Sequence, residues 1–179
     1  MPHDDLESLN FSEKLEKCFK NKEKLRRDIQ GGKSAQSLLG VSDKEMHALY
    51  QAARALLEGG KFEAAANAFL FLATLNPKEG DYWFGLGSAL VKQGDLEGAR
   101  DALELSTLCG GENPLPYFQL AKILFGLGER EATLEALDWT LEMSSHDEKY
   151  SAIREEAEAA KKLLKKPKKR PPSNKGKHT

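Results

Sequence analysis

The chain has 179 residues, of which 40% are apolar and 31% are charged, a composition typical of a soluble globular protein. Two isolated cysteines do not form a disulfide framework, and no apolar run reaches the ~18 residues that a membrane helix needs. The first ten residues, MPHDDLESLN, are too polar for a secretory signal peptide. We therefore expect a cytoplasmic protein with no stable insertion into a membrane.

The net charge of −1 conceals two regions of opposite sign. Residues 46–147 contain 15 acidic and 7 basic residues, whereas residues 161–179 contain 9 basic residues and no acidic one. The end of the chain, residues 167–179, is rich in Lys and Pro, which predicts a disordered tail. Such a tail could contact nucleic acid or an acidic surface such as a membrane, which is the alternative. Because no aromatic residue is interleaved to stack on bases, we expect a solvated tail that binds no nucleic acid.

The first expected element is one charged helix within an N-terminal region of helix and linker, residues 1–41. Apolar residues recur along it every three or four positions if Lys22 fills one gap, which gives a narrow seam like that of a coiled coil. Such a seam favours self-association as a homodimer or binding of a partner helix, and packing on the following repeat is an equally good alternative. The seam residues are Phe11, Leu15, Cys18, Leu25 and Ile29.

A 34-residue repeat occupies the middle of the chain, within residues 42–147. Its three copies, 46–79, 80–113 and 114–147, align without an insertion. The apolar spacing of each copy predicts two helices joined at a glycine, which can adopt a left-handed cap with little strain. These glycines are Gly60, Gly94 and Gly128. Since one helix pair cannot bury its apolar face alone, the sequence predicts an all-α, right-handed solenoid of three stacked pairs.

Local signals mark where several helices begin and end. Asn113 followed by Pro114 predicts a cap and a first helical residue. Two segments have the spacing of a capping box. They are Ser42 with Glu45 and Ser145 with Glu148. After the repeats, residues 148–166 form an expected C-terminal capping helix that covers the open face of the last repeat and stops at Pro167.

The spacing of one set of residues in the second copy resembles the tetratricopeptide repeat. The set is Trp83, Leu86, Gly87, Ala99 and Leu103. The wider stretch LYQAARALLEGGKFEAAANAFLFLATLNPKEGDYWFGLGSALVKQGDLEGARDAL resembles the class II chaperones of type III secretion. In that family an N-terminal helical region precedes three such repeats and a final helix follows. The resemblance implies a chaperone that holds hydrophobic translocator proteins before export.

Repeat positions also predict a peptide-binding groove on the first helices of the three copies. In this solenoid those helices line the concave face, and equivalent positions place apolar side chains in two rows. Aromatic residues at helical spacing can also belong to the core, which is the alternative. Each copy supplies its core from other positions, however, so a second apolar row favours an exposed binding surface. An extended translocator segment with Pro and Leu anchors would suit it. The predicted groove residues are Tyr50, Arg54, Leu57, Phe84, Ser88, Val91, Phe118, Lys122 and Phe125. The resemblance implies pockets at Tyr50, Leu57 and Phe84.

Other functions find less support in the sequence. A co-chaperone that clamps carboxylates needs several cations on the concave face, but Arg54 is the one cation at the matching positions. A generic tetratricopeptide scaffold that binds a peptide of another partner is the alternative. The segment GGKS at 31–34 lacks the first Gly of a phosphate-binding loop, since Arg27 occupies that position. The four histidines are not at metal-ligand spacing. We therefore expect no enzyme activity, no cofactor and no metal.

Overall fold

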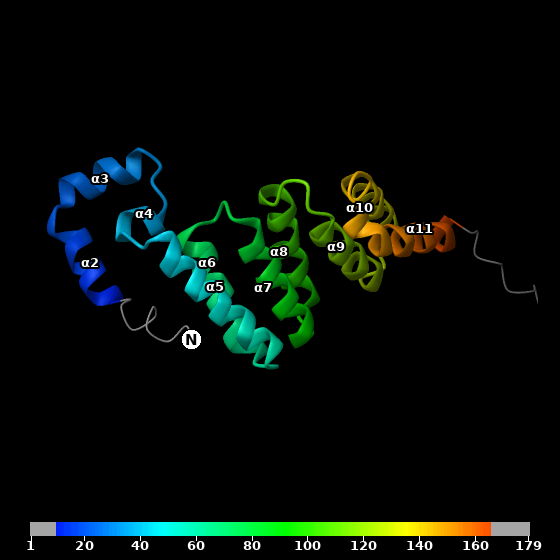
Figure 1. Ribbon diagram of the computed structural model, residues 1–179, viewed down its shortest axis with the longest axis horizontal. Helices are drawn as coiled ribbons and strands as arrows, with labels where there is room; N and C mark the ends of the chain where they lie inside the picture. Colours follow the sequence, from blue (N-terminus) through cyan, green and yellow to red (C-terminus); the bar gives the residue numbers. More distant parts are fainter. Residues whose placement is uncertain (1–9, 166–179) are drawn as a thin grey trace, which may run out of the picture.

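The computed structural model describes residues 10–165, and every regular element in that range is a helix (Figure 1). The all-α prediction is confirmed. The elements are α2 (Phe11–Lys20), α3 (Lys22–Gln30), α4 (Ala35–Leu39), α5 (Asp43–Glu58), α6 (Phe62–Leu75), α7 (Gly80–Gln93), α8 (Leu96–Cys109), α9 (Pro114–Gly126), α10 (Arg130–Met143), a 3-10 turn (Glu148–Tyr150) and α11 (Ser151–Lys165). The basic tail predicted for residues 167–179 lies outside the described residues.

The helices from α5 to α11 stack in the order of the chain. Each packs against the next, from α5 on α6 through to α10 on α11, and Figure 1 shows the pairs side by side along the long axis. Gly60, Gly94 and Gly128 have φ angles of 73°, 85° and 82°, so each glycine has the left-handed conformation expected at the end of a first helix. Contacts between neighbours in sequence are what a solenoid of repeats requires, and the solenoid prediction is confirmed.

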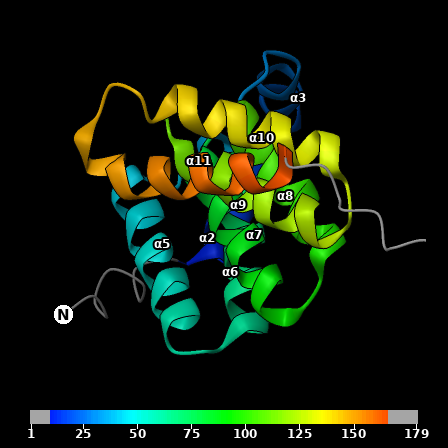
Figure 2. The same cartoon turned by 90° about the vertical axis from the view of Figure 1, so that its right-hand side faces the viewer.

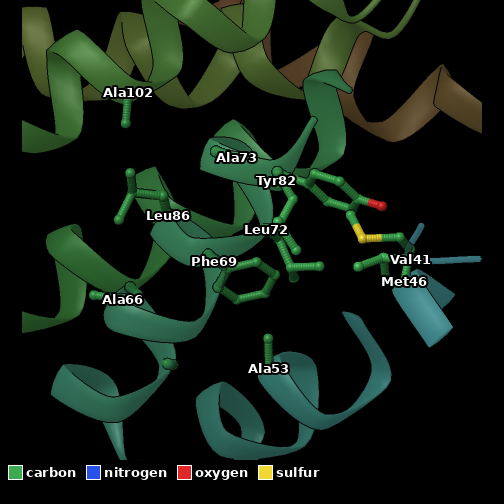
Figure 3. Close-up of a cluster of buried hydrophobic side chains, with 13 residues drawn as sticks. Val41, Met46, Ala53, Ala66, Phe69, Leu72, Ala73, Tyr82, Leu86 and Ala102 are labelled. Atoms are coloured by element: carbon green, nitrogen blue, oxygen red, sulfur yellow. The ribbon is translucent and has the colours of Figure 1, made fainter. Parts of the chain in front are cut away.

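Two apolar clusters form the interior. The first joins α5, α6 and α7 around Phe69 and Leu72, which are 1% and 0% exposed (Figure 3). The second joins the last two repeats to α11 and includes Leu103 and Ala157. Within the first cluster the Phe69 ring lies so close to α7 that only a glycine, Gly85, fits opposite it. The core is thus distributed along the solenoid.

The capping predictions have mixed outcomes. At the start of α5, the Ser42 hydroxyl accepts a hydrogen bond from the Glu45 amide at 3.3 Å, and the Glu45 carboxylate accepts one from the Ser42 amide at 2.7 Å. The expected cap at Asn113 with Pro114 is also present. The prediction of a second capping box, Ser145 with Glu148, is wrong, because the Ser145 hydroxyl donates a hydrogen bond back to the Glu142 carbonyl. Asp147 caps the following 3-10 turn instead.

The prediction of one continuous N-terminal helix is also wrong. The helix breaks at Asn21, whose side chain accepts a hydrogen bond from the Lys24 amide at 2.9 Å and thereby starts α3, a role for which Asn is well suited. Phe11 of α2 contacts Phe71 of α6 edge-to-face, with ring centroids 5.2 Å apart. Part of the expected seam therefore packs on the first repeat.

Polar contacts hold α11 against the end of the solenoid. The guanidinium of Arg154 donates to the backbone carbonyls of Ser144 and Ser145, at 3.0 and 3.1 Å. These carbonyls follow the end of α10, where a cation is favourable. Lys161 forms an ion pair with Asp138 of α10. Figure 2 shows α11 running alongside α10 across this end of the molecule.

Candidate peptide-binding groove

The nine predicted groove residues lie on the first helix of each pair. Three come from each helix, and their spacing of three and four residues puts each set on one helix face. The sets are Tyr50, Arg54 and Leu57 on α5; Phe84, Ser88 and Val91 on α7; and Phe118, Lys122 and Phe125 on α9. The structure thus brings the residues into three parallel sets, although their exposure differs along the solenoid.

At the first repeat, Tyr50 is half-buried between two other aromatic rings. Its ring centroid lies 6.0 Å from that of Phe69 and 5.7 Å from that of Tyr82. Burial, followed by the negative charge of Asp81, raises the pKa of Tyr50 above its ordinary value of 10.0. Tyr50 is therefore a neutral phenol at physiological pH, with much of its ring committed to the core.

In the middle of the groove, the α7 side chains fill the space between the second and third repeats. Phe84, Ser88 and Val91 are all half-buried. Phe84 and Val91 pack against the second apolar cluster. A partner could reach only the outer part of these two side chains.

The α9 set differs most from the expectation of an open apolar row. Phe118 is only 7% exposed, which corrects the prediction that its ring stands open to solvent. The Lys122 ammonium lies over this ring, 4.0 Å from its centroid, in the geometry of a cation–π contact. Phe125, one helical turn further on, is 63% exposed. Tyr50 packs on Phe69 and Tyr82, and Phe84 and Phe118 belong to the second apolar cluster or pack against it, so this row belongs partly to the core.

Arg54 contributes a charge to the first repeat. It is exposed and pairs with Glu58 on the same helix at 3.0 Å. An exposed pair at this spacing contributes only about 0.3–0.5 kcal/mol. The guanidinium can therefore exchange this partner for a carboxylate of a bound segment at little cost.

A polar hollow of about 430 Å³ lies beside Tyr50, between the first turns of α5 and α7. Three carboxylates line it, together with both tyrosines of the ring cluster. The carboxylates are Asp43, Glu79 and Asp81. This end of the molecule is therefore acidic and polar, and its character differs from that of the opposite end.

A larger cleft of about 600 Å³, the C-terminal cleft, lies between α9, α10 and α11. Its walls are mainly apolar. They include Ala121, Phe125, Leu137, Ala160, Leu163 and Leu164. Sequence reasoning missed this cleft, although Phe118, Lys122 and Phe125 belong both to it and to the predicted groove. The paired leucines at the end of α11 were the available signal.

The residues predicted for self-association are divided between α2 and α3. Leu15 and Ile29 are 43% and 57% exposed, whereas Phe11, Cys18 and Leu25 are half-buried. Phe19, which the heptad-like pattern omitted, is 57% exposed. The apolar surface available to a second chain therefore centres on Leu15, Phe19 and Ile29, and its role in self-association stays a prediction.

Two further properties concern the described residues alone. No helix between residues 10 and 165 is long and apolar enough to cross a membrane. In the same range, no three His, Cys, Asp or Glu side chains are grouped as ligands for a metal ion.

Comparison with known proteins places this architecture in a class. A family model described as tetratricopeptide repeat matches residues 50–112. No curated protein matches the sequence. The fold is thus a tetratricopeptide-type solenoid, as the repeat pattern predicted.

Solved structures define the class more narrowly. One chain of a type III secretion complex from Aeromonas hydrophila is 21% identical in sequence to this chain. The two superpose with a TM-score of 0.75 over 80% of this chain and 96% of that chain. The translocator chaperone SycD of Yersinia enterocolitica is 19% identical, with a TM-score of 0.68 over 73% and 98% of the two chains. PcrH of Pseudomonas aeruginosa, in complex with the chaperone-binding region of PopD, is 21% identical, with a TM-score of 0.67 over 70% and 94%. The chain has the fold of the type III secretion translocator chaperones, and the predicted resemblance is confirmed for the fold.

Proposed function

We propose that this protein is a cytosolic chaperone that holds a hydrophobic translocator of a type III secretion system before export. The observation that carries the proposal is the fold, shared over most of the chain with chaperones solved together with translocator segments. SycD was solved with a peptide of the translocator YopD, and PcrH with the chaperone-binding regions of PopD and PopB. The proposed activity is holding, without catalysis.

The groove would bind an extended segment through a few anchors. Half-buried side chains on α5 and α7 leave their outer parts within reach of such a segment, and Phe125 offers an exposed ring further along. Ordering an extended segment opposes binding, so a small number of buried anchors would dominate the affinity. Covering such a segment keeps part of an aggregation-prone client away from other chains.

The test begins with the native client. The protein is captured from its own cytosol, and the proteins that co-purify are identified by mass spectrometry. We expect a secreted protein with membrane-inserting segments. Co-purification of clients without such segments would contradict the proposal and favour a generic tetratricopeptide scaffold.

A groove variant then locates the binding site. Because Tyr50 and Phe84 pack in the core, replacing them by Ala would perturb the fold, so Ser88→Arg is the better change. It places bulk and charge between Phe84 and Val91 on one face of α7 and is expected to weaken client binding by about tenfold, or about 1.4 kcal/mol. Thr74→Arg, on the exposed surface of α6, is the matched control and is expected to bind normally. Equal affinities in calorimetry would place the site elsewhere.

We also propose that the chain forms a homodimer through α2 and α3. The exposed apolar side chains Leu15, Phe19 and Ile29 support this proposal. A further SycD structure is described as an alternative dimer, so chains with this fold do pair. Light scattering of the full chain measures the mass directly.

A further inference from the structure

The C-terminal cleft has the size and lining of a binding site. Its volume of about 600 Å³ falls within the roughly 300–1,000 Å³ typical of ligand pockets. Three helices contribute to it, and α11 contributes Glu156, Ala160, Leu163 and Leu164. It therefore differs from the predicted groove, which draws on first helices alone, because α10 and α11 also line it.

Two large apolar side chains at this cleft face solvent. Phe125 of α9 is 63% exposed and Leu163 of α11 is 67% exposed. Single exposed apolar residues are ordinary, but apolar residues from different helices that converge on one cleft indicate an interaction surface. A partner that buries both would remove considerable apolar area from water.

The charges of the cleft favour an anionic partner. Lys122 and Arg130 line it together with one carboxylate, Glu156. None of the three forms an ion pair within the described residues, although the repeats around them are acidic. Two cations without carboxylate partners beside an apolar wall complement a segment that presents an apolar side chain next to acidic ones.

The chain's own C-terminal segment does not have this chemistry. Beyond Leu164 the sequence reads KKPKKRPPSNKGKHT. It contains seven basic residues, no acidic residue and no apolar side chain except proline. It would be repelled by the two cations and could not fill the apolar walls, so this segment is not the occupant.

We propose that the C-terminal cleft binds a partner segment in which Phe or Leu anchors are flanked by Glu or Asp. The anchors fill the apolar space between α9 and α11, and the acidic residues pair with Lys122 and Arg130. Because Phe118, Lys122 and Phe125 also belong to the predicted groove, this inference rests on the proposed function and specifies the far end of the same site. It adds α11 to the binding surface.

Short fluorescein-labelled peptides test the inference with the full chain. One peptide carries a central Phe-Leu pair flanked by Glu, the second carries the same pair flanked by Lys, and the third carries Ser-Ser flanked by Glu. In fluorescence anisotropy the first is expected to bind at least about tenfold more tightly than the other two. Equal binding of all three would overturn the proposal.

Variants then assign the binding to the cleft. Leu163→Glu is expected to abolish binding of the Glu-flanked Phe-Leu peptide, whereas Leu108→Glu, at an 80% exposed position on α8, is the matched control and should leave it unchanged. The double change Lys122→Glu and Arg130→Glu should reverse the preference toward the Lys-flanked peptide, and Lys61→Glu with Lys92→Glu is its control. Binding that survives Leu163→Glu but is lost in Ser88→Arg would place the peptide in the central groove and overturn the proposal.

Two further results separate the alternatives. If Leu163→Glu lowers the mass seen by light scattering, the cleft holds a second copy of the chain and the proposal is wrong. Since the peptides are not taken from a translocator, peptide binding without any captured translocator would refute the proposed function alone. A captured translocator whose binding is insensitive to peptide and to Leu163→Glu would refute the cleft alone.

Discussion

Replacing Gly85 by Ala is expected to destabilise the protein, although the same change stabilises most helices. Gly85 lies in the middle of α7 and is buried. Ala is more favourable than Gly in a helix interior by roughly 0.8–1.0 kcal/mol. Here, however, an added Cβ would lie within 2.5 Å of three carbon atoms of the Phe69 ring, well inside van der Waals contact.

The magnitude follows from how firmly Phe69 is held. Its side chain is 1% exposed, and the Tyr50 ring packs against it edge-on, so the ring has no free space to enter. Overpacking of this kind costs about 1–3 kcal/mol. Because three ring atoms are involved we take the upper half of that range, which after the gain in helix propensity leaves a net loss of about 1–2 kcal/mol.

A second substitution tests the cause. The second and third repeats carry Leu103 and Leu137 at the position of Phe69, so Phe69→Leu is a change that the architecture already accommodates. Alone it leaves a cavity and is expected to cost at least about 1 kcal/mol. Combined with Gly85→Ala it removes the clash, so the double variant should be more stable than the sum of the two losses by about 1–2 kcal/mol.

Urea unfolding of the four proteins measures these free energies. Far-UV circular dichroism and the fluorescence of Trp83 and Trp139 are followed together, because coincident curves are required before a two-state free energy can be extracted. A Gly85→Ala variant as stable as the wild type, or an additive double variant, would refute the reasoning from close packing.

Three other predictions concern the ends of the chain. Hydrogen bonds from the Ser42 amide and hydroxyl, and then the charge of Lys14, hold the pKa of Glu45 below its ordinary value of 4.5. The stabilisation by the Glu45 carboxylate is therefore complete above pH 4.5 and is lost as pH falls through the depressed pKa. Glu45→Gln should lower the free energy of unfolding at pH 7 by about 1 kcal/mol. The melting temperature of this variant should also depend less on pH in the acidic range. Phe19→Asp with Ile29→Asp should reduce the mass measured by light scattering without unfolding α5–α11, and a full chain that is already a monomer at high concentration would contradict a dimer seam. Removing residues 168–179 should leave client affinity at moderate salt and the melting temperature nearly unchanged, since screened charges without apolar anchors add little; a large loss of either would show that the tail takes part in binding.

The helix pairs were predictable because their signals are local. Glycines such as Gly94 recur at a fixed period, and each ends a helix through its own backbone conformation. Nearest-neighbour stacking then follows, since each pair has an apolar face to cover. The apolar pattern gave only a weak signal of the break at Asn21, because the seam resumes beyond it after a single gap at Lys22. The side chain of Asn21, which caps α3, determines where the first helix ends.

The openness of the groove was harder to predict for a different reason. Equivalent repeat positions show that Phe118 aligns with Tyr50, but not how closely successive first helices approach. That separation depends on packing between pairs and determines whether a row is core or surface. The C-terminal cleft depends in turn on how α11 meets α10, which is set by contacts such as those of Arg154 with the end of α10. No periodic pattern encodes such an angle.

The contact of Phe11 with Phe71 also has a consequence for synthesis on the ribosome. Phe71 is translated sixty residues after Phe11, which at about 5–20 residues per second corresponds to a delay of about 3–12 s. Each helix pair closes on residues made shortly before, and α2 can also pack early on α4, whereas the Phe71 ring that covers Phe11 is made much later. The part of its apolar face around Phe11 therefore stays open on every nascent chain for seconds, until Phe71 has been made.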